Sequence, residues 1–242
     1  MKLNKLKHIK DFPGKLNRFV KRGFKRGPEA FLRRVSGVIH VGANDGEERF
    51  MYANYNLDVV WIEPIPEVFA RLKNNLDDFP GQRAYQYLVT DQDGREYDFH
   101  IANNNGQSSS ILDFKQHKDI WADIHYEKSI SLKSTKLSSL IEVENIEMNK
   151  YDALVMDTQG TELLVLKGAE NLLSRFQYIK TEAADFEIYK NCCQVKDLED
   201  FLGNHGFKEL IRTKFASRED GGNCYDIVYK KSNWQRIKNS RS

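Results

Sequence analysis

Acidic residues stand at the ends of three apolar runs of the sequence, at Glu63, Asp157 and Glu182. The runs have the length of buried strands, and the carboxyl ends of parallel strands meet at one edge of a sheet, where ligands bind. A carboxylate at that edge can accept two hydrogen bonds from the cis-diol of a ribose, and another can take a proton from a reacting hydroxyl. The pattern therefore predicts a nucleoside-type ligand next to a group capable of acid–base chemistry.

A glycine-rich turn follows the first of the expected strands. The run GVIHVGA leads into residues 42–46, where glycines let the backbone approach a ligand closely. A dinucleotide fingerprint needs a second glycine where Asn44 stands and a third where Glu47 stands, and the carboxylates of Glu47 and Glu48 would repel a pyrophosphate. S-adenosylmethionine has a ribose, no phosphate and a sulfonium cation, so the acidic turn favours this cofactor.

Four stretches of the chain resemble the FkbM-type S-adenosylmethionine-dependent methyltransferases, namely VIHVGANDG, VVWIEPIPEVFARLKNNL, YDALVMDTQGTELLVLKGAENLL and the late GF…DIVYKK. The resemblance covers about residues 36–231, and its most specific part is D-x-Q-G-x-E followed by VLKGA. It implies an α/β fold of the class I methyltransferase (Rossmann-like) type, a doubly wound sheet of about seven strands whose last strand is antiparallel. It also implies methyl transfer, usually to a hydroxyl oxygen of a sugar or natural product.

The resemblance further implies a cofactor site at the strand ends. Glu63 takes the ribose, and the acid after the third strand, Asp91, lies near the adenine. Two positions depart from the family, because His40 stands where many relatives have an Asp that helps to hold the methionine ammonium, and Val155 where many have Lys. The expected cofactor-binding residues are His40, Gly42, Ala43, Asn44, Gly46, Glu63, Pro64, Asp91, Ser108, Ser109 and Asp157.

Three side chains are the candidates for the chemistry itself. Asp157 could hold the amino group of the cofactor, take the proton of the acceptor or, together with Glu182, bind Mg²⁺. In the segment 111–130, His117 and His125 lie among aromatic residues that suit a lid over a sugar, and either histidine has the pKa of a general base. The predicted catalytic set is Asp157, Glu182 and His125, and the need for a metal stays open.

Apolar runs alternate with amphipathic stretches along most of the chain, which predicts parallel β–α–β units. The final two strands have no helix between them, so they are expected to form a hairpin that contains an antiparallel strand. The segment 111–130 is ambiguous. Strands are predicted at 37–43, 58–63, 84–90, 96–102, 152–157, 177–182, 208–214 and 225–230, helices at 46–56, 66–79, 135–142, 161–175 and 195–204, and a polar loop at 103–110.

Positive charge is concentrated at the start of the chain. Residues 1–34 hold twelve Lys and Arg against two acidic residues, whereas the rest holds 25 Lys and Arg against 33 Asp and Glu. We therefore divide the chain into a basic N-terminal extension at 1–34, a methyltransferase domain at 35–231 and a C-terminal tail at 232–242. The extension could make weak contact with an anionic surface or only aid solubility, and the acidic body disfavours a broad nucleic-acid face.

Three cysteines with no C-x-x-C spacing, no apolar run of bilayer length and no standard secretory signal predict a cytoplasmic protein. We expect a S-adenosylmethionine-dependent enzyme that methylates a hydroxyl of a saccharide, a glycan precursor or a natural product. Two alternatives stay open. One is ribose methylation of a nucleic acid held by the basic extension, and the other is a protein that binds the cofactor without catalysis.

Overall fold

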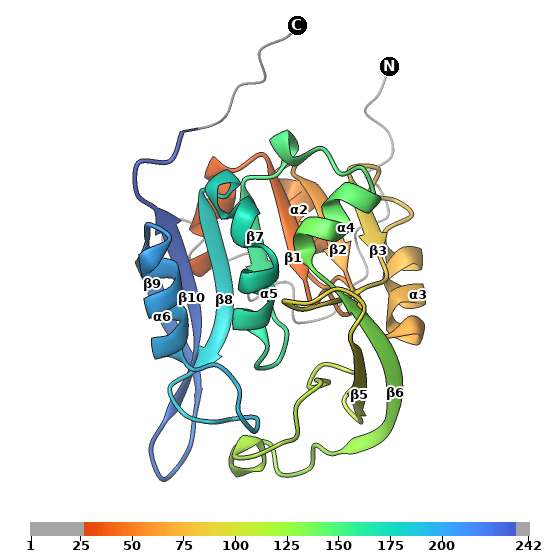
Figure 1. Ribbon diagram of the computed structural model, residues 1–242, viewed down its shortest axis with the longest axis vertical. Helices are drawn as coiled ribbons and strands as arrows, with labels where there is room; N and C mark the ends of the chain where they lie inside the picture. The colour runs from red at the N-terminus through yellow and green to blue at the C-terminus, as the bar shows by residue number, and fades with distance from the viewer. Residues whose placement is uncertain (1–26, 236–242) are drawn as a thin grey trace, which may run out of the picture.

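Seven strands form the central sheet of the computed structural model, which describes residues 27–235 (Figure 1). The strands follow the order β3-β2-β1-β7-β8-β10-β9. β10 runs antiparallel to both of its neighbours, and the other adjoining strands are parallel. This topology confirms the predicted class I methyltransferase fold. The strands are β1 (Gly37–Val41), β2 (Asp58–Ile62), β3 (Gln82–Tyr85), β7 (Ala153–Met156), β8 (Tyr178–Ala184), β9 (Phe207–Ser217) and β10 (Asn223–Lys231).

Helices cover both faces of the sheet because the short strands are apolar on both sides. Alternate residues of a strand point to opposite faces, so Ile39 packs into one layer and Val38 into the other. The first layer, which faces the viewer in Figure 1, contains α4 (Leu137–Val143), α5 (Glu162–Gly168) and α6 (Val195–Asn204). The second contains η1 (Pro28–Arg34), α2 (Arg49–Asn54) and α3 (Pro66–Asn75).

The third apolar run forms two strands rather than the single strand predicted at 84–90. β3 joins the central sheet, whereas β4 (Leu88–Val89) pairs with β6 (Tyr126–Thr135) in a second sheet of order β4-β6-β5, where β5 is Glu96–Ala102. The backbone N–H of Thr90 continues this pairing by donating to the Thr135 carbonyl at 2.9 Å. The chain has therefore left the central sheet before it reaches Asp91.

Other boundaries differ where tertiary contacts override local pattern. The helix predicted at 161–175 divides into α5, which ends at Gly168, and the 3-10 helix η4 (Glu170–Arg175). At Gly168 the backbone lies so close to Thr90 that a Cβ would come within 2.1 Å of the Thr90 carbonyl oxygen. The ambiguous segment 111–130 contains η2 (His117–Asp119) and the start of β6, and η3 (Met148–Lys150) precedes β7. The predicted hairpin of the last two strands is confirmed.

Residues 28–34, which we had assigned to the basic extension, pack against the sheet. Phe31 and Leu32 are 4% and 1% exposed, and the ring centroid of Phe31 lies 5.5 Å from that of Tyr178. Residues 1–26 and 236–242, which include most of the predicted extension and tail, lie outside the described residues. Within the part of the chain that is described, no helix has the length and apolar character needed to cross a membrane.

Candidate active site

The carboxyl ends of β1 and β7 line a cavity of about 570 Å³ at the point where the strand order reverses. Open α/β sheets bind ligands at this switch point. β1 leads into Gly42, which has a φ of +80°, and a Cβ there would come within 1.9 Å of the Asp157 carbonyl oxygen. Only glycine lets the two strand ends lie so close together.

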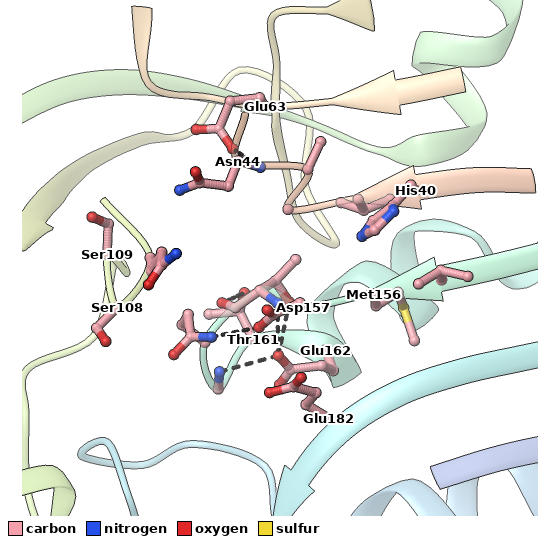
Figure 2. Close-up of a pocket in the computed structure, with 18 of the residues that line it drawn as sticks. His40, Asn44, Glu63, Ser108, Ser109, Met156, Asp157, Thr161, Glu162 and Glu182 are labelled. Carbon is pink, nitrogen blue, oxygen red and sulfur yellow. Dashed lines mark hydrogen bonds between the residues drawn. The ribbon is translucent and has the colours of Figure 1, made fainter. Parts of the chain in front are cut away.

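Glu63 lies directly after β2, on the wall of the cavity next to Asn44 (Figure 2). Its Oε2 accepts a hydrogen bond from the Asn44 backbone N–H at 2.9 Å, and its Oε1 accepts one from the Ile65 N–H at 2.9 Å. Burial raises the pKa of Glu63 to about 7, although these two bonds oppose the rise. Each carboxylate oxygen keeps a second lone pair, so the geometry fits the predicted bonds to a ribose diol.

Asp157 and Glu182 lie across the cavity from Glu63 (Figure 2). Burial, and next to it the charge of Glu162, raises the pKa of Asp157 to about 7. Burial and the charge of Asp157 raise the pKa of Glu182 well above its ordinary value. Two close carboxyls in such surroundings cannot both be ionised at little cost, so this pair holds a proton at neutral pH.

The loop after β7 is held by its own motif. Glu162, at the start of α5, accepts the backbone N–H groups of Thr158 at 2.9 Å and Gly160 at 3.2 Å. Gln159 donates from Nε2 to the Oδ1 of Asp157, and its Oε1 accepts the hydroxyl of Tyr189 at 2.6 Å. Glu162 therefore shapes the loop, while Gln159 sets the orientation of the Asp157 carboxylate.

Most of the predicted cofactor residues line the cavity, but two do not. A Cβ on Gly46, where φ is +75°, would come within 2.7 Å of Leu72 Cδ1, so this glycine serves the packing of the turn against α3. Asp91 follows β4 into the second sheet, away from the strand ends. The cavity lining includes His40, Gly42, Ala43, Asn44, Glu63, Pro64, Ser108, Ser109 and Asp157.

The structure does not place the predicted catalytic histidine, His125, in the lining of the cavity. Its side chain is exposed just before β6 begins, does not line the cavity, and places Nδ1 3.3 Å from the Asp123 carbonyl. His117 lines the cavity instead, 1% exposed and stacked on Phe114 with ring centroids 4.3 Å apart. Burial lowers the pKa of His117 to about 4, so its ring is neutral.

The sequence analysis did not assign Lys180 to the site. It is the one lysine or arginine among the described residues that line the cavity, and it pairs in register with Val155 of β7. Its Nζ lies 3.1 Å from the Asp226 carboxylate and 3.5 Å from that of Glu29. The available signal for Lys180 was a charged side chain inside a strand expected to be buried. Its two acidic partners could not be predicted, because they come from β10 and η1, which are distant in the sequence.

The mouth of the cavity carries aromatic side chains from two distant segments. Trp121 follows η2, and Phe215 of β9 lines the cavity while 46% exposed. Residues 27–235 contain no group of three or more His, Cys, Asp or Glu side chains placed to hold a metal ion, the need for which the sequence left open. Asp185, a further candidate ligand, is exposed and accepts the Asn223 N–H at 2.7 Å instead.

S-adenosylmethionine fits these surroundings. The volume lies within the range of small-molecule sites, and the buried Glu63 carboxylate provides acceptors for a ribose. Carboxylates dominate the charged lining, which suits a sulfonium cation and disfavours a pyrophosphate. Gly42 keeps the floor free of side-chain bulk where the cofactor would approach the backbone.

Two solved methyltransferases resemble the chain at low identity. One is magnesium protoporphyrin IX methyltransferase (ChlM) of Synechocystis PCC 6803 with bound S-adenosylmethionine, at 12% identity and a TM-score of 0.47, covering 84% of this chain and 76% of that one. The other is TrmK of M. capricolum in complex with S-adenosylhomocysteine, at 8% identity and a TM-score of 0.48, covering 88% and 71%. At these scores they add nothing to the topology described above.

Sequence comparison identifies the family. Residues 40–209 match the methyltransferase FkbM domain. A relative, the 2-O-methyltransferase NoeI of Sinorhizobium fredii (strain NBRC 101917 / NGR234), is 27% identical over 173 residues, which cover 68% of this chain and 70% of the relative. The chain therefore belongs to the FkbM-domain methyltransferases and is a S-adenosylmethionine-dependent methyltransferase.

Proposed function

We propose that this enzyme transfers a methyl group to a hydroxyl oxygen of a saccharide. The observation that carries the proposal is the similarity to a relative named as a 2-O-methyltransferase. The cavity supports it, because the carboxyls of Asp157 and Glu182 and the aromatic side chains of Trp121 and Phe215 line the same cavity. The apolar face of a sugar ring can pack on the two aromatic side chains, and its hydroxyls can donate hydrogen bonds to the carboxyls.

The residues of the chain divide the work of the reaction. When bound, S-adenosylmethionine would supply the methyl group: an O–C bond to the acceptor oxygen would form in line as the S–C bond breaks and the thioether of S-adenosylhomocysteine leaves. Asp157 takes the proton of the hydroxyl, since it lines the cavity and Gln159 occupies only its Oδ1. Burial and the charge of Asp157 raise the pKa of Glu182 well above its ordinary value, so Glu182 holds a proton beside an ionised Asp157.

The charge of the cavity disfavours ribose methylation of a nucleic acid. Lys180 is ion-paired with Asp226 and Glu29, so it is not available to a phosphate. A phosphodiester would face Glu47, Glu182 and the other carboxylates that line the cavity. A protein that binds the cofactor without catalysis is disfavoured too, because the chain belongs to a family of methyltransferases.

The experiment is a methyl-transfer screen with labelled S-adenosylmethionine. The purified full chain is incubated separately with a panel of neutral saccharides, with a glycan extract and with RNA. We expect label in base-stable methyl ethers of saccharides, located by mass spectrometry. Label in RNA alone, or on nitrogen, would overturn the proposal.

A pair of variants on one strand sharpens the test. Phe215→Ala removes the aromatic wall, whereas Leu210→Ala removes a side chain that is 56% exposed on β9 but lies outside the cavity. We expect Phe215→Ala to raise the KM of the accepted saccharide several-fold with no change in the Kd of the cofactor. Leu210→Ala should change neither, and equal effects of the two variants would contradict an acceptor site at this mouth.

A further inference from the structure

The ammonium group at the methionine end of the cofactor needs an anionic or acceptor partner in a buried site. His40 offers no charge for it. The ring is 4% exposed and stacks on Trp61 with centroids 4.9 Å apart, and its Nδ1 lies 3.2 Å from the Tyr52 hydroxyl. Burial, aided by Lys180, lowers the pKa of His40 to about 3, so the imidazole is neutral. A neutral imidazole can only accept a hydrogen bond, so any negative charge beside the ammonium has to come from another residue.

Glu48 provides a carboxylate whose charge acts on Tyr52, the residue whose hydroxyl lies against the ring of His40. It immediately precedes α2, and the Tyr52 backbone N–H donates to the Glu48 carbonyl at 3.0 Å in the first turn of this helix. Tyr52 then reaches back to the ring of His40. All three residues line the cavity, so the chain places a carboxylate beside the position where the strand carries histidine.

In the part of the chain that the structure describes, the carboxylate of Glu48 has no counter-ion of its own. Apart from its own backbone N–H, it has neither a hydrogen-bond donor nor an ion pair among the described residues 27–235. Lys180, the cation that acts on it electrostatically, is bound to Asp226 and Glu29. Burial raises the pKa of Glu48, which reflects the cost of a buried charge without a partner. A ligand cation beside this carboxylate would remove that cost.

We propose that Glu48 binds the methionine ammonium of S-adenosylmethionine and S-adenosylhomocysteine, the contact that His40 cannot make. The loop after β1 and α2 then hold the methionine part, and Glu63 holds the ribose. Asp157 is left for the acceptor. This assignment depends on the cofactor of the family and is independent of whether the acceptor is a saccharide.

Calorimetry with two ligands tests the assignment without turnover. S-adenosylhomocysteine is compared with its analogue that lacks the α-amino group, on the wild-type full chain and on Glu48→Gln. A lost charge-assisted hydrogen bond weakens binding about 10- to 100-fold. We expect Glu48→Gln to raise the Kd of S-adenosylhomocysteine by that factor and to leave the Kd of the deaminated analogue unchanged. Asp185→Asn, which removes the charge of an exposed carboxylate that does not line the cavity, is the control and should stay near wild type.

The alternatives give different results. Equal weakening of both ligands by Glu48→Gln would assign Glu48 to the shape of the wall and overturn the proposal. Wild-type protein that binds both ligands equally would overturn it too, even if the variant does not fold. Asp157→Asn completes the set, because loss of the preference for the amino group in this variant alone would assign the ammonium to Asp157.

Discussion

Replacing Asp157 by Asn separates the charge of this side chain from its shape. The Oδ1 of an asparagine can still accept the Gln159 amide, so the orientation of the side chain is retained while its ability to take a proton is lost. A positioned general base contributes about 10²- to 10⁴-fold to a rate. We therefore expect kcat/KM to fall at least about 100-fold, which corresponds to roughly 2.7 kcal/mol of transition-state stabilisation.

The pH dependence provides the second measurement. Burial raises the pKa of Asp157 to about 7, so the base is protonated below that pH and ionised above it. The kcat/KM of the wild-type enzyme should rise with pH and level off above about 7, and the Asn variant should lack this rise. The assay measures release of S-adenosylhomocysteine across pH, with the Kd of the cofactor measured in parallel.

Asp185→Asn is the matched control for the charge change. This carboxylate follows β8, is exposed, and accepts hydrogen bonds from the Asn223 N–H and the Tyr225 hydroxyl rather than lining the cavity. Its replacement should leave the rate near wild type. The reasoning is refuted if Asp157→Asn retains activity within about threefold, or if its cofactor Kd rises as much as kcat/KM falls, which would assign Asp157 to cofactor binding.

Three further outcomes follow from buried groups. Glu63→Ala should weaken cofactor binding by at least about tenfold in calorimetry, and an unchanged Kd would exclude the ribose contact. The same variant should have a lower melting temperature, because two backbone N–H groups lose their acceptor. Leu32→Ala should lower the free energy of unfolding by about 2–5 kcal/mol and the melting temperature of the full chain by roughly 4–20 °C, whereas replacing the exposed Leu210 by Ala should change neither. Equal melting curves for the two variants would contradict the packing of η1 against the core. Since burial raises the pKa of Glu63 from 4.5 to about 7, this group stabilises the cofactor-free protein at low pH, and chemical denaturation should show that contribution decreasing as pH rises from about 4.5 to 7; a flat profile would contradict it.

Elements whose pattern is local could be predicted from the sequence. The strands that contain Ile39, Val60 and Leu154 are short apolar runs between turn residues, and the order of strands and helices then restricts the topology to a doubly wound sheet. The prediction of a single strand at 84–90 was wrong, because the partners with which a strand pairs decide which sheet it joins. The contact of Thr90 with Thr135 is invisible to any local pattern.

The candidate site divides in the same way. The sequence alone determined Gly42, Glu63 and Asp157, since each stands at the end of a strand and strand ends converge whatever the details of packing. Tertiary structure alone decided between His117 and His125, because the orientation of the segment before β6 depends on how that strand pairs with β5.

Charge pairing was likewise decided only in three dimensions. Lys180 acquires its counter-ions from η1 and β10, residues 151 positions before it and 46 positions after it in the chain. The same arrangement leaves Glu48 without a counter-ion among residues 27–235. Local sequence records which side chains are charged, but burial and the distance between charges set their pKa values and partners. The sequence therefore determined the fold and the cofactor class, while the protonation and role of each buried group depended on contacts between segments remote in the chain.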